Sequence, residues 1–65
     1  MIIAILDEFY SKVKTLKKIR VDPVYWVTYY LDERTGEKWI EERLHSELHG
    51  GGPPQLRLLE NFPWE

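Results

Sequence analysis

The fold is decided by residues 24–31, which have the sequence Val-Tyr-Trp-Val-Thr-Tyr-Tyr-Leu. Almost every residue in this run is β-branched or aromatic, which is the composition of a β-strand. Successive side chains of a strand point to opposite faces, and both faces of this strand are apolar or amphipathic. One face can therefore pack against a helix, while the other is left for water or for a second surface.

The residues that follow predict a hairpin and two further strands. Residues 32–36, Asp-Glu-Arg-Thr-Gly, form a polar loop in which Gly36 is placed for a left-handed conformation. The chain then returns as a second strand over residues 38–44, and a short third strand covers residues 55–59. Phe62 and Trp64 are expected to tether the tail that follows.

The N-terminal segment predicts an amphipathic helix over residues 2–19. Its apolar side chains recur at steps of three and four, as one face of a helix requires. Pro23 ends the segment, because proline disfavours helix at the residue before it. The predicted fold is α+β, with one N-terminal amphipathic helix packed on a three-stranded antiparallel meander, in a single domain of residues 1–65. The apolar stripe consists of Ile2, Leu6, Phe9, Val13 and Leu16, widened by Ile5 and Tyr10.

Length and composition limit what the chain can be. With 65 residues it has a small core, which is marginally stable without reinforcement. It has no cysteine, which excludes disulfides, thiol catalysis and cysteine-ligated metals. Aromatic residues make up 14% of the chain and can replace disulfides as reinforcement, and a partner chain can do the same.

Charge is unevenly distributed, although the formal net charge is −2. The first 20 residues hold five basic and two acidic side chains, whereas residues 32–65 hold eight acidic and four basic ones. This pattern disfavours binding to nucleic acid and favours a basic protein partner for the acidic half. The apolar start is interrupted by Asp7 and Glu8, is too short to cross a bilayer and lacks a basic leader region. We therefore expect a cytoplasmic protein with no membrane contact.

A loop rich in glycine and proline is predicted over residues 45–54. It places three consecutive glycines, the most flexible backbone in the chain, directly before two prolines, the stiffest. On an extended segment His45, Glu47 and His49 share one face, and such side chains are plausible ligands for zinc. Neighbouring side chains on one strand diverge, however, and no fourth ligand is evident. The sequence predicts no metal and no other cofactor, with hydrogen bonds to the loop backbone as the role of these side chains.

The sequence also predicts that the chain is not an enzyme. Residues 49–52, His-Gly-Gly-Gly, match the oxyanion-hole tetrapeptide of some lipases. Those enzymes need a nucleophile elbow, and the chain contains no Gly-x-Ser-x-Gly. A chain of this size also rarely builds the concave pocket that catalysis requires.

Binding to another protein is the function that these residues favour. Tyrosine and tryptophan are frequent anchors of protein interfaces, although they can equally complete a core that is too small for aliphatic residues alone. Both possibilities are open at this point. The candidate partner-contacting residues are Trp26, Tyr29, Tyr30, Trp39, Glu41, Glu47, His49, Gly50, Gly51 and Gly52.

Two features of the sequence resemble a bacterial protein family. The spacing of Gly36 and Trp39 and a longer glycine- and proline-rich string are similar to the pattern of the polymorphic-toxin immunity proteins called immunity protein twenty-seven. The resemblance implies a small cytoplasmic protein that neutralises a toxin by stoichiometric binding. Separately, we expect a monomer or weak homodimer. An inhibitor of a host defence enzyme carried by a phage or plasmid, and a homodimeric structural or regulatory subunit, are the alternatives. The string is Ser46-Glu47-Leu48-His49-Gly50-Gly51-Gly52-Pro53-Pro54.

Overall fold

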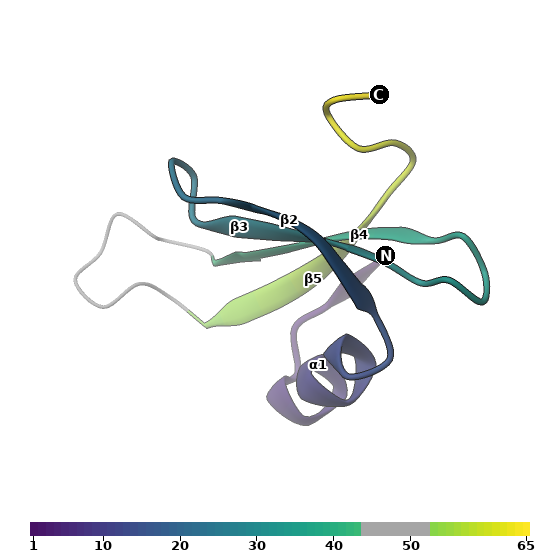
Figure 1. Ribbon diagram of the computed structural model, residues 1–65. Coiled ribbons are helices and arrows are strands. Elements are labelled where there is room, and N and C mark those ends of the chain that lie inside the picture. Colours follow the sequence, from purple (N-terminus) through teal and green to yellow (C-terminus); the bar gives the residue numbers. More distant parts are fainter. Residues whose placement is uncertain (44–52) are drawn as a thin grey trace.

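The computed structural model describes residues 1–43 and 53–65. In this part of the chain one short helix accompanies a five-stranded antiparallel sheet (Figure 1). The predicted α+β class is confirmed, but the prediction of three strands is wrong. The elements in chain order are β1 (Ile2–Ile3), α1 (Leu6–Val13), β2 (Lys17–Asp22), β3 (Val27–Leu31), β4 (Lys38–Arg43) and β5 (Pro54–Leu59).

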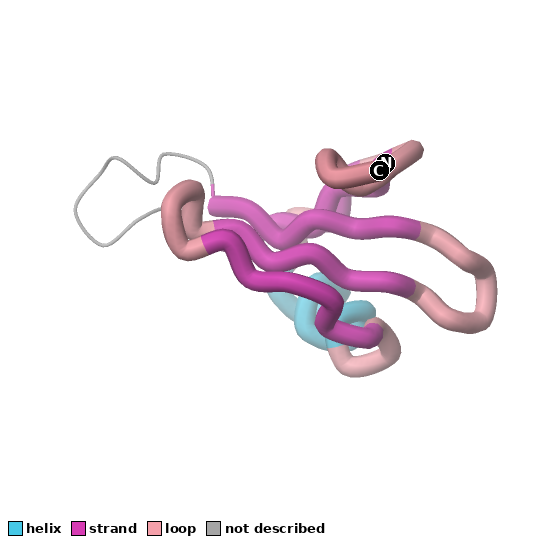
Figure 2. The backbone as a smooth tube through the Cα atoms, turned by 45° about the horizontal axis from the view of Figure 1, so that its top comes forward, coloured by secondary structure: helices cyan, strands magenta, loops and turns pink. Residues whose placement is uncertain are grey.

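The strands are arranged in the order β1-β5-β4-β3-β2. Strands β2 to β5 form a meander, and β1 joins its far edge by pairing with β5. Trp39 of β4 lies between Tyr30 of β3 and Leu58 of β5 in the register. The two turns at the ends of β3, residues 23–26 and 32–37, lie at opposite ends of the sheet (Figure 2).

The predicted helix over residues 2–19 is wrong in length, because α1 has only eight residues. Tight hydrogen bonds end the helix: the Leu16 N–H donates to the Val13 carbonyl at 3.1 Å, and the Thr15 hydroxyl donates to the Lys12 carbonyl at 2.8 Å. The residues after this turn pair with β3 as β2. The β-branched residues of β2, Ile19 and Val21, suit a strand. Pairing with β3 satisfies the backbone hydrogen-bonding groups of this segment, so the helix that the apolar spacing predicted does not continue.

The predicted strand over residues 24–31 begins late, at Val27, because residues 23–26 form a turn. Asp22 Oδ1 accepts hydrogen bonds from the backbone N–H groups of Val24 at 2.9 Å and Tyr25 at 3.3 Å. An aspartate that bonds to the next backbone donors, followed by a proline, starts a turn. The break predicted before residue 24 is therefore a hairpin turn that extends to residue 26.

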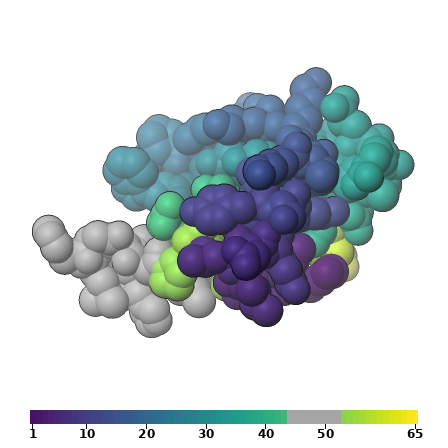
Figure 3. Space-filling view, turned by 90° about the horizontal axis from the view of Figure 1, so that it is seen from below, coloured from purple at the N-terminus to yellow at the C-terminus, as the bar shows by residue number. Residues whose placement is uncertain are grey.

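Each face of the sheet is covered by a different segment (Figure 1). We call the face under α1 the helix face, and its buried residues are Phe9, Tyr30, Trp39 and Leu56. We call the opposite face the tail face, and its buried residues are Val27, Tyr29, Ile40 and Phe62. Seen from the helix side, the N-terminal residues cover the middle of the molecule (Figure 3). Both faces of β3 are thus buried, so the second surface that the sequence left open for its other face is the chain's own C-terminal tail.

Candidate partner-binding surface

Three of the four aromatic residues predicted to contact a partner lie inside the protein. Trp39 is 1% exposed and Tyr30 is 7% exposed on the helix face, and Tyr29 is 8% exposed on the tail face. These three side chains complete the core, which was the alternative that the sequence left open. Trp26 differs from them, because 75% of it is exposed at the turn between β2 and β3.

Glu41 is engaged with the core rather than with the surface. It is half-buried on β4, near Tyr30 of the helix face. Burial raises the pKa of the Tyr30 hydroxyl, and interaction with Glu41 raises it further.

The other predicted contact residues are Glu47, His49 and the three consecutive glycines at positions 50–52. They lie outside the described residues, as does His45 of the zinc alternative. The predictions that rest on them stay predictions. The described end of this segment is Pro54, which is buried as the first residue of β5 and lies opposite Arg43. Proline is tolerated at such a strand start.

The C-terminal tail is held against the tail face by aromatic rings, as the sequence predicted. The rings of Phe62 and Trp64 stack at 4.7 Å with an interplanar angle of 13°. Both rings meet Tyr29 edge-on, at 5.9 Å and 4.9 Å between centroids. The Arg20 guanidinium of β2 lies 4.2 Å from the centroid of the Trp64 ring, a cation–π contact. The tail therefore replaces water on a sheet face that the helix does not reach.

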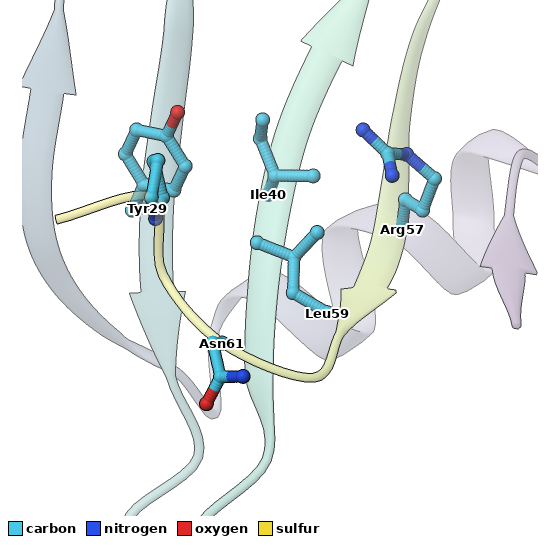
Figure 4. Close-up of a pocket in the computed structure, with 6 residues that line it drawn as sticks. Tyr29, Ile40, Arg57, Leu59 and Asn61 are labelled. Carbon is cyan, nitrogen blue, oxygen red and sulfur yellow. The ribbon is translucent and has the colours of Figure 1, made fainter. Parts of the chain in front are cut away.

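A shallow pocket of about 240 Å³ lies between this tail and the sheet (Figure 4). Its charged member, Arg57, is paired with Glu42: Nε donates to Glu42 Oε1 at 2.8 Å and Nη2 donates to Oε2 at 3.4 Å. These bonds from Arg57, and a further one from Gln55, lower the pKa of Glu42 against the opposing effect of burial. The lining residues are Tyr29, Ile40, Arg57, Leu59, Asn61 and Pro63.

The chemistry of this pocket does not suit catalysis or a small ligand. Pockets for small molecules usually enclose about 300–1,000 Å³ and hold unpaired polar groups that fix the ligand. This pocket is smaller, and its guanidinium is already engaged by Glu42. Its described lining also holds no pairing of a nucleophile with a base.

The turn between β2 and β3 carries a run of three highly exposed apolar side chains, and a second group of exposed apolar side chains lies at the N-terminus and on α1. Val24, Tyr25 and Trp26 are consecutive, and their exposed fractions are 76%, 74% and 75%. We call these three residues the apolar tip. Sequence reasoning missed Val24 and Tyr25 as surface residues because it placed them in a strand. The Asp22-Pro23 pair was the signal that could have identified the turn.

Comparison with known families identifies the chain. A model of the family described as Immunity protein 27 matches residues 10–60, which is most of the chain. The chain belongs to the immunity protein 27 family. Immunity proteins are typically non-enzymatic inhibitors, and membership implies that a toxin is neutralised by binding. No curated protein and no solved structure matches the chain.

The family match spans β2 to β5 of this immunity protein, with both turns at the ends of β3. Strand β1 and the tail that begins at residue 61 lie outside it. The apolar tip thus belongs to the part of the chain that the family defines, whereas the tail-face pocket depends on Asn61 and Pro63 beyond the match. Among the described residues, no helix of this immunity protein is long and apolar enough to cross a membrane.

Proposed function

We propose that this immunity protein acts in the cytoplasm as a monomer, where it forms a stoichiometric complex with a bacterial toxin and thereby inhibits it. Family membership supplies the class of partner. The observation that carries the rest is the exposed apolar tip, because a contiguous apolar patch marks an interaction site more often than scattered apolar residues do. Tyrosine and tryptophan are also the residues most enriched among energetically important interface contacts.

The monomeric state is supported by the basic side chains along the free edge of the sheet. Strand β2 is the last strand of the described sheet on its side, so its outer backbone groups have no strand partner there. Lys17, Lys18 and Arg20 are exposed along this strand. Lysine side chains on an edge strand oppose its pairing with another strand. A homodimer through this edge is therefore disfavoured.

The proposal is tested with the C-terminal domain of the protein encoded by the gene adjacent to this chain's gene, which is the candidate toxin. The purified chain should form a complex of defined stoichiometry with this domain in light scattering after gel filtration. Co-expression should restore the growth of bacteria that produce the domain. Because a monomer does not dissociate, the melting temperature of the free chain should not depend on its concentration.

Two results would contradict the proposal. A toxin domain that remains active and unbound in excess of the chain would remove the inhibitory function. A melting temperature that rises with protein concentration would favour a homodimer instead. Cell fractionation tests the location, and recovery of the chain outside the cytoplasm would contradict that part of the proposal.

A further inference from the structure

Each of the two turns at the ends of β3 contains one residue with a positive φ, and the two residues are very different in size. The β3–β4 turn has the polar sequence Asp-Glu-Arg-Thr-Gly-Glu, and Gly36 takes the positive φ, +79°. In the β2–β3 turn the positive φ, +57°, belongs to Trp26. A bulky residue rarely adopts this conformation, because its Cβ crowds the neighbouring carbonyl oxygen. Trp26 is therefore in a conformation that glycine or asparagine would adopt at lower cost.

Packing within the chain does not account for this choice. Trp26 is 75% exposed, and the aromatic and cation–π contacts of the described residues involve Trp39 and Trp64 but not Trp26. Its neighbours Val24 and Tyr25 are equally exposed. Strained backbone that the fold itself does not need is characteristic of functional positions.

The apolar tip is also held in place before any partner arrives. Asp22 Oδ1 accepts two backbone hydrogen bonds from it, and Pro23 fixes its own φ at the start of the turn. Directly below, Asp22 lies opposite Val27 in the β2–β3 ladder. A preorganised segment loses little conformational entropy on binding, so its contacts contribute more of their energy to affinity.

The chemistry of the apolar tip selects one kind of occupant. Residues 23–31 carry no charge, and Lys17 and Lys18 lie at the other end of β2. Phosphate-bearing partners, whether nucleic acid or anionic lipid, are recognised through lysine and arginine. A convex group of three large side chains instead fits an apolar pocket in a protein. Acceptors at its rim would serve the Tyr25 hydroxyl and the Trp26 indole N–H.

We propose that the apolar tip inserts into an apolar pocket of the toxin. Trp26, whose backbone is in the left-handed conformation, anchors this contact. The inference rests on the proposed function, because it takes the toxin as the partner. It names the contacting segment, and it assigns Val24 and Tyr25 to the interface with Trp26. It also relates the positive φ of Trp26 to binding, since this residue is 75% exposed.

The test compares Trp26→Gly and Tyr25→Ala with Glu33→Ala, a control at the exposed β3–β4 turn. The probe is the toxin domain encoded in the adjacent gene, titrated by calorimetry. Because Trp26→Gly removes the anchor, its affinity for the toxin domain should be at least about thirtyfold lower than that of the parent. The free Trp26→Gly protein should melt at the same temperature as the parent or higher, because glycine relieves the positive φ. Glu33→Ala should bind like the parent.

Each remaining outcome has a defined meaning. If the parent binds and both tip variants bind equally well, this inference fails while the proposed function stands. If the parent itself does not bind, both fail. Vesicles of phosphatidylcholine with and without phosphatidylglycerol provide the membrane arm of the test. A blue shift of the tryptophan emission on vesicles that Trp26→Gly abolishes would overturn the toxin pocket in favour of a lipid surface.

Discussion

Lys12 Nζ lies 3.2 Å from Asp32 Oδ2, so an ion pair joins helix α1 to the turn that follows β3. The aspartate is fully buried, and its Oδ1 also accepts hydrogen bonds from the Arg34 backbone N–H at 3.0 Å and from Arg34 Nε at 3.4 Å. The same ammonium lies 3.7 Å from Glu37 Oε1 and 5.3 Å from the centroid of the Trp39 ring. The helix is thus oriented over the core by charge as well as by apolar contact.

This arrangement predicts a loss of stability in acid. Burial acts to raise the pKa of Asp32, but hydrogen bonds from Arg34 and Lys12 outweigh it and lower the pKa from 3.8 to about 2. Because the folded protein holds this proton more weakly than the unfolded chain, the ionised carboxylate stabilises the fold. The contribution is complete above the unfolded value of 3.8 and is lost as the pH falls through about 2. Urea unfolding at a series of acidic pH values measures it.

The control for this prediction is Asp32→Asn, which cannot ionise. Glu42 adds a slope of the same sign, since the hydrogen bond from Arg57 lowers its pKa, so the wild-type profile alone does not isolate Asp32. The difference between the parent and Asp32→Asn should shrink toward acid pH. Glu33→Gln, at an exposed neighbour, should leave the profile unchanged. A constant difference across the whole range would show that ionisation of Asp32 is not involved.

Trp39 should be the residue whose truncation costs the fold most. It is 1% exposed and contacts the helix-face core, so Trp39→Ala should lower the free energy of unfolding by about 3–5 kcal/mol. Trp39→Phe should cost less than half as much, because it keeps a ring and removes an indole N–H that has no acceptor among the described residues. Urea unfolding measures both variants. Equal costs would show that this N–H is satisfied after all.

The β3–β4 turn offers a test of backbone strain without steric clash. Gly36 has a φ of +79°, and a Cβ built there meets nothing within 4 Å. Gly36→Ala should therefore destabilise the fold by about 1 kcal/mol through its backbone alone. Gly36→Asn should cost less, because asparagine tolerates the left-handed region. If alanine is tolerated without loss in urea unfolding, the turn has relaxed to another conformation.

The central hairpin of the sheet, formed by β3 and β4, could be predicted from the local sequence. The aromatic residues of β3, the polar turn with Gly36 and the return strand gave the central hairpin, because alternation and turn chemistry act over a few residues. The Phe62 and Trp64 tether was also predictable, since large rings in a short tail need a surface to cover. These elements depend on local chemistry, which a sequence displays directly.

The errors lie where tertiary pairing overrides local pattern. Residues 17–19 were predicted to end the helix and residues 20–22 to form a break, yet residues 17–22 form β2 because the edge of β3 is available to pair with them. Likewise, β1 was missed although Ile2 and Ile3 are β-branched, because its partner β5 lies more than fifty residues away. For the candidate site, Trp26 is exposed as a partner contact requires, but burial of Tyr29, Tyr30 and Trp39 depends on how α1 and the tail cover the sheet.

The lysines on the unpaired edge of β2 should keep the protein monomeric. An unpaired edge exposes backbone donors and acceptors that another strand can use, and lysine side chains oppose such pairing. Replacing Lys17 and Lys18 by valine leaves the run Val-Val-Ile-Arg-Val, which combines high β-propensity with low charge. This double variant should associate as its concentration rises, measured by light scattering. Lys14→Val, in the turn after α1, changes charge and apolarity away from the edge and should remain monomeric. If the double variant also stays monomeric at high concentration, the lysines are not what prevents two copies from pairing through β2.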